Sequence, residues 1–298
     1  MQSVLIAGNG SQTLAHEISK QTKIKLLKTE TLQFSDSETL IRIKESVQGK
    51  TVYVLEQMNA PVNDKVMELL LLCNAAKENR AKKVIALVPY LGYSRQDRVT
   101  KTGEPISIKV LAKALLSAGC TKMITVDIHS QRGKKYFGKK LTNLEFFNVS
   151  IHELKKRNWK NEIVIAPDEG ARKLAKKYGK TLKTQIAWME KYRPKPEAVA
   201  ELKLHGIVNG KNALIVDDMI NTASTMKPVV ELLRKNGVKK ISVLVTHGLF
   251  SEPATQRLNE LNLDEIIVSN SLDQTKNKKK IKKLKILSLA ELLGNDIQ

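Results

Sequence analysis

The sequence predicts an α/β fold in which parallel sheets are flanked by helices, and two observations support this prediction. Short apolar runs rich in β-branched residues alternate with segments of helical period along the chain. In addition, residues 108–130 align without a gap with residues 226–248, which indicates a duplicated domain. Strands that alternate with helices form parallel sheets with helices on both faces.

Each predicted strand is a short, mainly apolar run between polar segments. In chain order the runs are residues 4–7, 51–55, 84–88, 123–126, 163–166, 213–216, 241–245 and 265–268. A strongly basic run at 276–285 follows, and it is expected to be a solvated loop that leads into a short strand.

Each copy of the repeat combines a helix, a glycine, a polar turn and a strand that ends near a histidine. Gly119 corresponds to Gly237, and a glycine at this place suits a left-handed helix cap. His129 corresponds to His247. A lone histidine at a strand end is more often structural than a ligand, and His247 is expected to be of that kind.

The loops just upstream of the repeat differ between the two copies. The first copy has a long polar loop at 90–105, and the second has a compact loop at 217–225. Ligands of open parallel sheets bind at the carboxyl ends of strands, so two different substrates are expected at these loops. The chain of 298 residues is therefore predicted to form two domains, at residues 1–147 and 148–298.

The composition is typical of a globular protein, with 42% hydrophobic and 27% charged residues. No apolar run approaches the roughly 20 residues that a membrane helix needs. Residues 1–7 lack the pattern of a secretory signal, so a cytoplasmic location is expected. Cys73 and Cys120 lie in apolar context without metal-ligand spacing, and both are expected to be reduced core thiols.

The formal net charge of +21 makes phosphate-bearing ligands, nucleic acid and anionic membranes physically reasonable partners. Most of the 51 basic residues are lysines, a bias more typical of surface solubility than of bidentate recognition. Nucleic acid would further require a groove-reading motif or interleaved aromatic residues. We therefore expect neither a nucleic-acid partner nor a membrane partner.

The compact loop reads VDDMINTAST, residues 216–225, and lies between a predicted strand and a predicted helix. Asp217 and Asp218 can accept two neighbouring hydroxyls or help to hold a hard cation. The small and hydroxyl residues after them leave room for backbone N–H groups to bind a phosphate. The alternative is structural, with Asp218 starting a turn and Thr225 capping a helix.

VDDMINTAST resembles the phosphoribosyl-diphosphate-binding loop of type I phosphoribosyltransferase folds. With further segments, the whole chain resembles ribose-phosphate pyrophosphokinases, and the sequences of its motifs are closer to those of the archaeal-type branch. The resemblance implies two tandem type I phosphoribosyltransferase-like domains, each with a mainly parallel sheet flanked by helices. The further segments are FSDSE at 34–38, PVND at 61–64, YSRQDR at 93–98, DIHS at 127–130, APDEGA at 166–171 and EKYR at 190–193.

The resemblance also implies an activity. The β,γ-diphosphate of ATP would pass to the C1 hydroxyl of ribose 5-phosphate, giving 5-phosphoribosyl 1-diphosphate and AMP. The first domain would bind ATP, the second ribose 5-phosphate, and Mg²⁺ would be the cofactor. The expected assembly is a homo-oligomer built from dimers.

The family's site residues can be transferred to matching positions. The resemblance implies that His129 and Asp168 act at the metal, and carboxylates suit Mg²⁺ better than imidazole does. It implies that Lys191 and Arg193 are catalytic, since positioned cations stabilise charge on phosphoryl oxygens. It implies that ATP is bound by Phe34, Asp36, Ser37, Glu38, Arg95, Gln96 and Arg98, with Asp36 and Glu38 supplied by a neighbouring subunit. It implies that ribose 5-phosphate is bound by Arg193, Asp217, Asp218, Asn221, Thr222, Ala223, Ser224 and Thr225.

The sequence also departs from the family's usual pattern. Ser224 stands where most relatives have Gly, and a positive φ there would cost on the order of 1 kcal/mol. Gln48 and Gly103 stand where regulated relatives carry Arg, so weak inhibition by ADP is expected. Three alternative functions are a catalytically silent regulator, a phosphoribosyltransferase acting on a base, and a nucleic-acid-binding protein.

Overall fold

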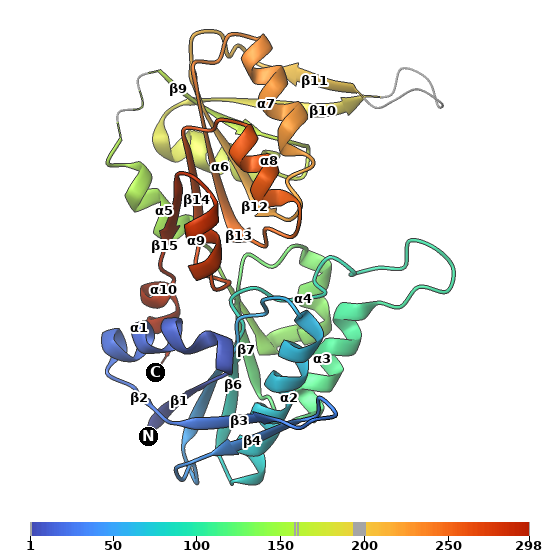
Figure 1. Cartoon of the computed structure of the whole chain (residues 1–298), viewed down its shortest axis with the longest axis vertical. Helices are drawn as coiled ribbons and strands as arrows, with labels where there is room; N and C mark the ends of the chain where they lie inside the picture. Colours follow the sequence, from blue (N-terminus) through green and yellow to red (C-terminus); the bar gives the residue numbers. More distant parts are fainter. Residues whose placement is uncertain (1, 158, 160, 193–200, 298) are drawn as a thin grey trace. The chain divides into compact units, whose positions relative to one another are not determined.

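A computed structural model describes residues 2–157, 159, 161–192 and 201–297 of the chain. The chain forms two compact units. Unit 1 comprises Met1–Phe146, Ser271–Asp273 and Ser288–Gln298, and unit 2 comprises Phe147–Asn270 and Gln274–Leu287. In each unit, helices pack against a central sheet (Figure 1).

The sheet of unit 1 has the strand order β2-β1-β5-β6-β7-β8, and its pairs are parallel. A separate antiparallel hairpin, β3–β4, packs against α2, and α10 packs against α1. The strands are β1 (Ser3–Ala7), β2 (Lys25–Leu26), β3 (Thr29–Gln33), β4 (Thr39–Ile43), β5 (Thr51–Leu55), β6 (Lys83–Leu87), β7 (Lys122–Val126) and β8 (Leu141–Leu144). The α-helices are α1 (Gln12–Thr22), α2 (Val62–Glu78), α3 (Ser107–Ser117), α4 (Gln131–Phe137) and α10 (Ala290–Gly294), and short 3-10 turns span Asn9–Ser11 and Gly138–Lys140.

The sheet of unit 2 has the strand order β11-β10-β9-β12-β13-β14-β15. Its pairs are parallel except for β10 and β11, which form an antiparallel edge. The strands are β9 (Glu162–Ala166), β10 (Gln185–Tyr192), β11 (Glu201–His205), β12 (Asn212–Ile220), β13 (Lys240–Gly248), β14 (Glu265–Ser269) and β15 (Leu284–Leu287). The helices are α5 (Phe147–Leu154), α6 (Arg172–Leu182), α7 (Met226–Lys235), α8 (Ala254–Glu260) and α9 (Thr275–Lys280).

The predicted α/β fold with parallel sheets is confirmed, and each of the predicted strands is present. Every residue of β5 is buried, which explains its continuous apolar sequence, since strands covered on both faces do not alternate apolar with polar residues. Cys73 and Cys120 are free and buried, as expected. Among the helices of the described residues, none has the length and apolar character needed to cross a membrane.

The repeat is confirmed as a shared helix–glycine–strand unit, α3–β7 in unit 1 and α7–β13 in unit 2. Gly119 has φ +105° and Gly237 has φ +80°, conformations that glycine adopts without steric cost. In both copies the residue after the glycine donates its N–H to a carbonyl five residues earlier, at 3.1 Å. The same turn therefore directs each chain from helix to strand.

The prediction of a loop immediately after Val216 is wrong. Strand β12 continues to Ile220, because its backbone keeps pairing with β13 as far as Gly248. Asp217 therefore lies on a strand, where its backbone is fixed by the sheet, and the compact loop is reduced to residues 221–225.

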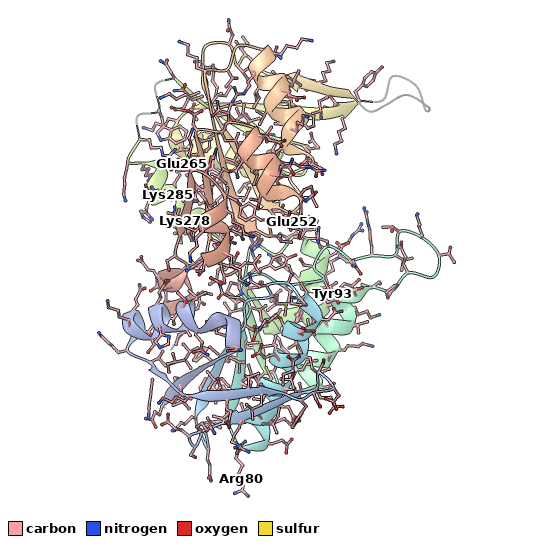
Figure 2. The ribbon with its side chains drawn as sticks, viewed as in Figure 1. Arg80, Tyr93, Glu252, Glu265, Lys278 and Lys285 are labelled. Atoms are coloured by element: carbon pink, nitrogen blue, oxygen red, sulfur yellow. The ribbon has the colours of Figure 1, made fainter. Side chains whose placement is uncertain are left out.

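The prediction of a solvated loop for the basic run is also wrong, because the run contains α9. Its lysines are not uniformly solvated. Lys278 donates from Nζ to the carbonyl of Leu284, and Lys285 forms an ion pair with Glu153. Lys278 and Lys285 lie on the same side of unit 2 (Figure 2). The run forms a helix because lysine has a high helix propensity. The Leu284 carbonyl and the Glu153 carboxylate offset part of the repulsion between the lysines.

A buried carboxyl group lies just beyond the end of β5 in unit 1. Glu56 has no exposed surface (0%), and its Oε1 is 3.8 Å from the ammonium of Lys65. That ammonium is 2.6 Å from Glu68. Burial, reinforced by the negative charge of Glu68, raises the pKa of Glu56 from 4.5 to about 9. Glu56 is therefore neutral at pH 7.

This pKa predicts how stability changes with pH. The folded protein keeps the proton of Glu56 up to about pH 9, whereas the unfolded chain loses it near pH 4.5, so the free energy of unfolding falls between these values. We expect Glu56→Gln to raise the melting temperature. The advantage over wild type should grow between pH 6 and pH 9, by on the order of 1 kcal/mol per pH unit.

Thermal unfolding followed by circular dichroism at several pH values measures this effect. Glu45→Gln is the matched control, because Glu45 is exposed and its hydrogen bond from Lys25 lowers its pKa. Parallel pH profiles for wild type and Glu56→Gln would contradict the assignment of a neutral buried carboxyl group.

Candidate active site

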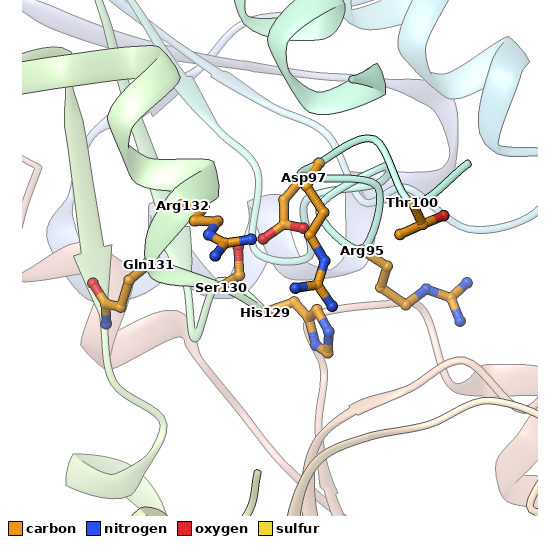
Figure 3. A pocket seen from close by; sticks show the side chains of 8 residues that line it. Arg95, Asp97, Thr100, His129, Ser130, Gln131 and Arg132 are labelled. Atoms are coloured by element: carbon orange, nitrogen blue, oxygen red, sulfur yellow. The ribbon is translucent and has the colours of Figure 1, made fainter. Parts of the chain in front are cut away.

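Pocket A is a cavity of about 380 Å³ in unit 1. It lies between the long loop after β6 and the segment that leads into α4 (Figure 3). The structure thus brings together three sequence-predicted residues, Arg95, Arg98 and His129. The complete lining is Arg95, Asp97, Arg98, Thr100, His129, Ser130, Gln131 and Arg132.

Hydrogen bonds on both sides of His129 fix the turn that carries it. The N–H of Ile128 donates to Oδ1 of Asn143 at 2.7 Å. Ser130 is the N-cap of α4, and its Oγ accepts the N–H of Gly133 at 3.1 Å. The backbone of His129 is therefore held at the entrance to α4, with its side chain at the pocket.

The long loop is held against two helices. The hydroxyl of Tyr136 on α4 donates to the carbonyl of Asp97 at 3.2 Å. The hydroxyl of Ser107, the first residue of α3, donates to Oε1 of Gln96. Gln96 is exposed and does not line pocket A, in contrast to its neighbours Arg95 and Asp97.

Pocket A is rich in forked cationic donors. Arg95, Arg98 and Arg132 each present a guanidinium, and Asp97 is the carboxylate among the lining residues. Guanidinium groups match phosphate oxygens in pairs. Arg132 was not predicted from the sequence. Its position two residues after DIHS could have indicated it, since it lies close to His129 in the chain and lines the same pocket.

The segment FSDSE forms the turn of the β3–β4 hairpin. Oδ1 of Asp36 accepts the N–H of Glu38 at 3.0 Å, and Ser37 has φ +75°. Phe34 is 52% exposed. These residues do not line pocket A, so the structure leaves the Phe34 ring open on the surface of unit 1.

Pocket B is a cavity of about 200 Å³ in unit 2. The ends of β9, β10 and β12 and the start of α7 supply its walls. Five sequence-predicted residues meet there, namely Asp168, Lys191, Asp217, Ser224 and Thr225. The remaining lining residues are Pro167, Leu202, Pro228 and Val229.

Asp217 is the most perturbed group of pocket B. Burial, followed by the charge of Asp218, raises its pKa from 3.8 to about 8, and the charge of Asp168 acts in the same direction. Oδ1 of Asp217 accepts the N–H of Asp218 at 2.8 Å. Oδ1 of Asp168 accepts the N–H of Ala171 at 3.0 Å. Hydroxyl donors or a cation at this place would relieve the repulsion between carboxylates.

The loop 221–225 contains one strained residue. Ala223 has φ +55°, a left-handed conformation that costs an L-residue on the order of 1 kcal/mol. The carbonyl of Ala223 accepts the N–H of Met226 at 3.2 Å, and the hydroxyl of Thr222 donates to Oγ of Ser224 at 3.2 Å. The expected strain is therefore present in the loop, but on Ala223 and not on Ser224.

Lys191 lies on β10, opposite Leu202 of β11, and both line pocket B. Arg193 lies outside the described residues. The two residues expected at the metal belong to different units, His129 to unit 1 and Asp168 to unit 2. Within the described part of the chain, no group of three or more His, Cys, Asp or Glu side chains is arranged to hold a metal ion alone.

Comparisons with known proteins agree with this site chemistry. A family model described as the N-terminal domain of ribose phosphate pyrophosphokinase matches residues 3–119, and a phosphoribosyl synthetase-associated domain matches residues 189–298. The ribose-phosphate pyrophosphokinase of Fusobacterium nucleatum is 35% identical over 98% of this chain and 93% of its own length. The corresponding protein of Aquifex aeolicus is 37% identical over 99% and 94%. A crystal structure of phosphoribosylpyrophosphate synthetase from Mycobacterium smegmatis matches with a TM-score of 0.93 and 31% identity, covering 100% of this chain and 98% of that one.

Proposed function

Because the chain belongs to the ribose-phosphate pyrophosphokinase family, we infer that it is a ribose-phosphate diphosphokinase. It transfers the β,γ-diphosphate of ATP to the C1 hydroxyl of ribose 5-phosphate, giving 5-phosphoribosyl 1-diphosphate and AMP for nucleotide biosynthesis. The observation that carries this conclusion is similarity along the whole chain, with 37% identity over 99% of its residues. The two pockets supply the chemistry that two phosphorylated substrates need.

ATP is assigned to pocket A, in a first domain of residues 1–147. Arg95 and Arg98 would donate to the phosphates, and Arg132 adds a third guanidinium. Gln96 lies in the chain between two lining residues, Arg95 and Asp97, and would bind the purine edge. The hairpin turn with Phe34, Asp36, Ser37 and Glu38 would come from a second copy of the chain, since its aromatic ring is exposed and unit 1 does not use it to line the pocket.

Ribose 5-phosphate is assigned to pocket B, in a second domain of residues 148–298. Asp217 and Asp218 accept the two neighbouring ribose hydroxyls, since carboxylate oxygens are acceptors for hydroxyl donors. The N–H groups of the loop bind the 5-phosphate at the start of α7. Asn221, Thr222, Ala223, Ser224 and Thr225 form this loop.

The chemistry of the donor set fits Mg²⁺. Asp168 and Asp217 present carboxylate oxygens to pocket B, the donors that hard cations prefer, and His129 lines pocket A among phosphate-binding groups. When bound with ATP, Mg²⁺ neutralises charge on the phosphoryl oxygens. We assign Asp168 and His129 to hold it, directly or through water.

The residues of this chain then orient and stabilise an in-line displacement. Asp217 and Asp218 orient the ribose so that its C1 hydroxyl oxygen attacks the β-phosphorus of ATP. As this bond forms, the bond from the β-phosphorus to the oxygen that bridges the α-phosphorus breaks, AMP leaves with that oxygen, and the hydroxyl proton passes to solvent. Negative charge builds on the transferring phosphoryl oxygens, where the ammonium of Lys191 stabilises it. Arg193 has the same role by position in the sequence.

We further propose a homo-oligomer built from dimers in the cytoplasm. Two free, buried cysteines suit a reducing compartment. The exposed Phe34 of the β3–β4 hairpin provides a surface for the second copy. Sedimentation velocity measures the oligomeric state. A monomer at all protein concentrations would contradict the proposal that two copies of the chain share the ATP site.

The function is tested by mixing the protein with Mg-ATP and ribose 5-phosphate and measuring AMP. We expect AMP to form only when ribose 5-phosphate is present, in an amount equal to the phosphoribosyl diphosphate. Free ribose, which lacks the phosphate, is the control. If no AMP forms at any pH or phosphate concentration, the protein is a non-catalytic regulator. Product formed only with a purine or pyrimidine base would indicate a phosphoribosyltransferase.

A further inference from the structure

An arginine contacts the phosphate loop, residues 221–225, from outside pocket B. Arg257 of α8 donates from Nη1 to the carbonyl oxygen of Thr222 at 2.9 Å. Arg257 does not line pocket B but a separate groove between α7 and α8, which it shares with Arg234. The contact therefore acts on the loop without touching the space where substrate would lie.

The carbonyl of Thr222 and the N–H of Ala223 belong to one planar, trans peptide group and point in opposite directions. By holding the carbonyl toward α8, Arg257 directs the N–H of Ala223 away from its own guanidinium. Ala223 is buried and does not itself line pocket B, but the next residue, Ser224, does. Backbone N–H groups of a loop at the start of a helix are donors for phosphate oxygens. Arg257 thus determines the direction of one N–H group of the loop that precedes α7.

The same peptide group is under strain, because Ala223 has φ +55°. Rotating the group by about 180° would change ψ of Thr222 and φ of Ala223 together, and would return Ala223 to the relaxed region of negative φ. That rotation would also present the Thr222 carbonyl oxygen to the phosphate, which repels it. The loop needs a contact that holds the strained orientation, and the hydrogen bond from Arg257 is such a contact.

We propose that Arg257 is a positioning residue for ribose 5-phosphate, holding the Thr222–Ala223 peptide group so that the N–H of Ala223 faces the 5-phosphate. This proposal rests on the assignment of ribose 5-phosphate to pocket B.

The structure offers a matched control in Arg234 of α7. Its Nη2 donates to the carbonyls of Leu261 at 3.1 Å and Asn262 at 2.9 Å, in the turn after α8. Arg234 therefore binds backbone carbonyls in the same groove as Arg257 but does not contact the phosphate loop. Replacing it with Met removes the same chemical group with a similar loss of packing.

The experiment compares Arg257→Met with Arg234→Met by steady-state kinetics on the full chain. We expect Arg257→Met to raise KM for ribose 5-phosphate about tenfold, as for the loss of one charge-assisted hydrogen bond, with kcat and KM for ATP within about threefold of wild type. Arg234→Met should leave all three parameters near wild type. Equal effects of the two substitutions would overturn the proposal.

A second comparison separates peptide orientation from packing. In an Ala223→Gly background the positive φ is free of strain, so Arg257→Met should raise KM for ribose 5-phosphate only about two- to threefold. A simple packing role predicts the same factor in both backgrounds. If Arg257→Met does not fold, Arg257→Lys takes its place, with a smaller increase that Ala223→Gly removes.

Asp217→Asn distinguishes failure of the proposal from failure of the site assignment. If Asp217→Asn leaves KM for ribose 5-phosphate unchanged, ribose 5-phosphate does not bind in pocket B and the premise is wrong. If Asp217→Asn raises that KM and Arg257→Met does not, only the positioning role of Arg257 is lost.

Discussion

Lys191→Ala is expected to lower kcat by about 10²-fold or more while both substrate KM values stay within a few-fold of wild type. Lys191 lines pocket B from β10, so its ammonium lies beside the assigned sugar site. It makes its main contribution when charge builds on the transferring diphosphate. An interaction realised only in the transition state raises kcat without tightening substrate binding.

The control for Lys191 is Lys279→Ala, which removes an exposed lysine of α9 that lines neither pocket. Steady-state rates of AMP formation provide the measurement. A kcat near wild type for Lys191→Ala would refute the catalytic assignment, and a raised KM alone would make Lys191 a binding residue only.

Asp217→Asn is expected to raise KM for ribose 5-phosphate by about 10- to 100-fold and to change KM for ATP much less. The asparagine keeps one acceptor oxygen but cannot ionise when hydroxyl donors or a cation bind, and its amide nitrogen faces a ribose hydroxyl that must donate. Asp217 lies on β12 and lines pocket B, whereas the residues assigned to ATP line pocket A of unit 1. The effect should therefore be selective for the sugar substrate.

Asp264→Asn is the matched control, because Asp264 accepts the N–H of Ile241 near the start of β13, where it lines neither pocket. Kinetics with each substrate varied in turn measure the selectivity. Equal losses for ribose 5-phosphate and ATP after Asp217→Asn would remove the assignment of Asp217 to the sugar hydroxyls.

The buried central strands and the repeat could be predicted because their signals are local, whereas the parallel strands β2, β8 and β10 were not predicted. A fully buried run such as β5 has an unbroken apolar sequence, and the glycines of the repeat mark the same helix end twice. The antiparallel pair β3–β4 was not predicted, since neither strand is fully buried and neither has a continuous apolar run. Short exposed strands are specified by their partners more than by their own composition.

The prediction that the strand ends at Val216, made because polar residues follow it, was wrong. Asp217 and Asp218 favour turns by composition, yet backbone pairing with β13 continues through them. The strained residue of the loop also could not be assigned from sequence, because Ala223 and Ser224 are equally poor candidates for positive φ. Tertiary contacts decide between them.

The sequence could not reveal contacts between distant segments. Arg257 lies 35 residues after Thr222, in a short helix with no motif of its own. The position of Arg132 beside DIHS indicates that it lies near His129, but only the fold shows that Arg95 and Arg98 line the same pocket. The site residues named from family resemblance stay predictions, and the pockets show which of them share a cavity.

The transfer of position-labelled phosphate tests the account most directly. With ATP labelled with ³²P at the β-phosphate, in Mg²⁺ and ribose 5-phosphate, the account predicts that the label appears in 5-phosphoribosyl 1-diphosphate and that none remains in AMP. Label from the α-phosphate should remain wholly in AMP. Transfer of the γ-phosphate alone, with the β-label retained in ADP, would contradict the diphosphate transfer on which the assignment of both pockets depends.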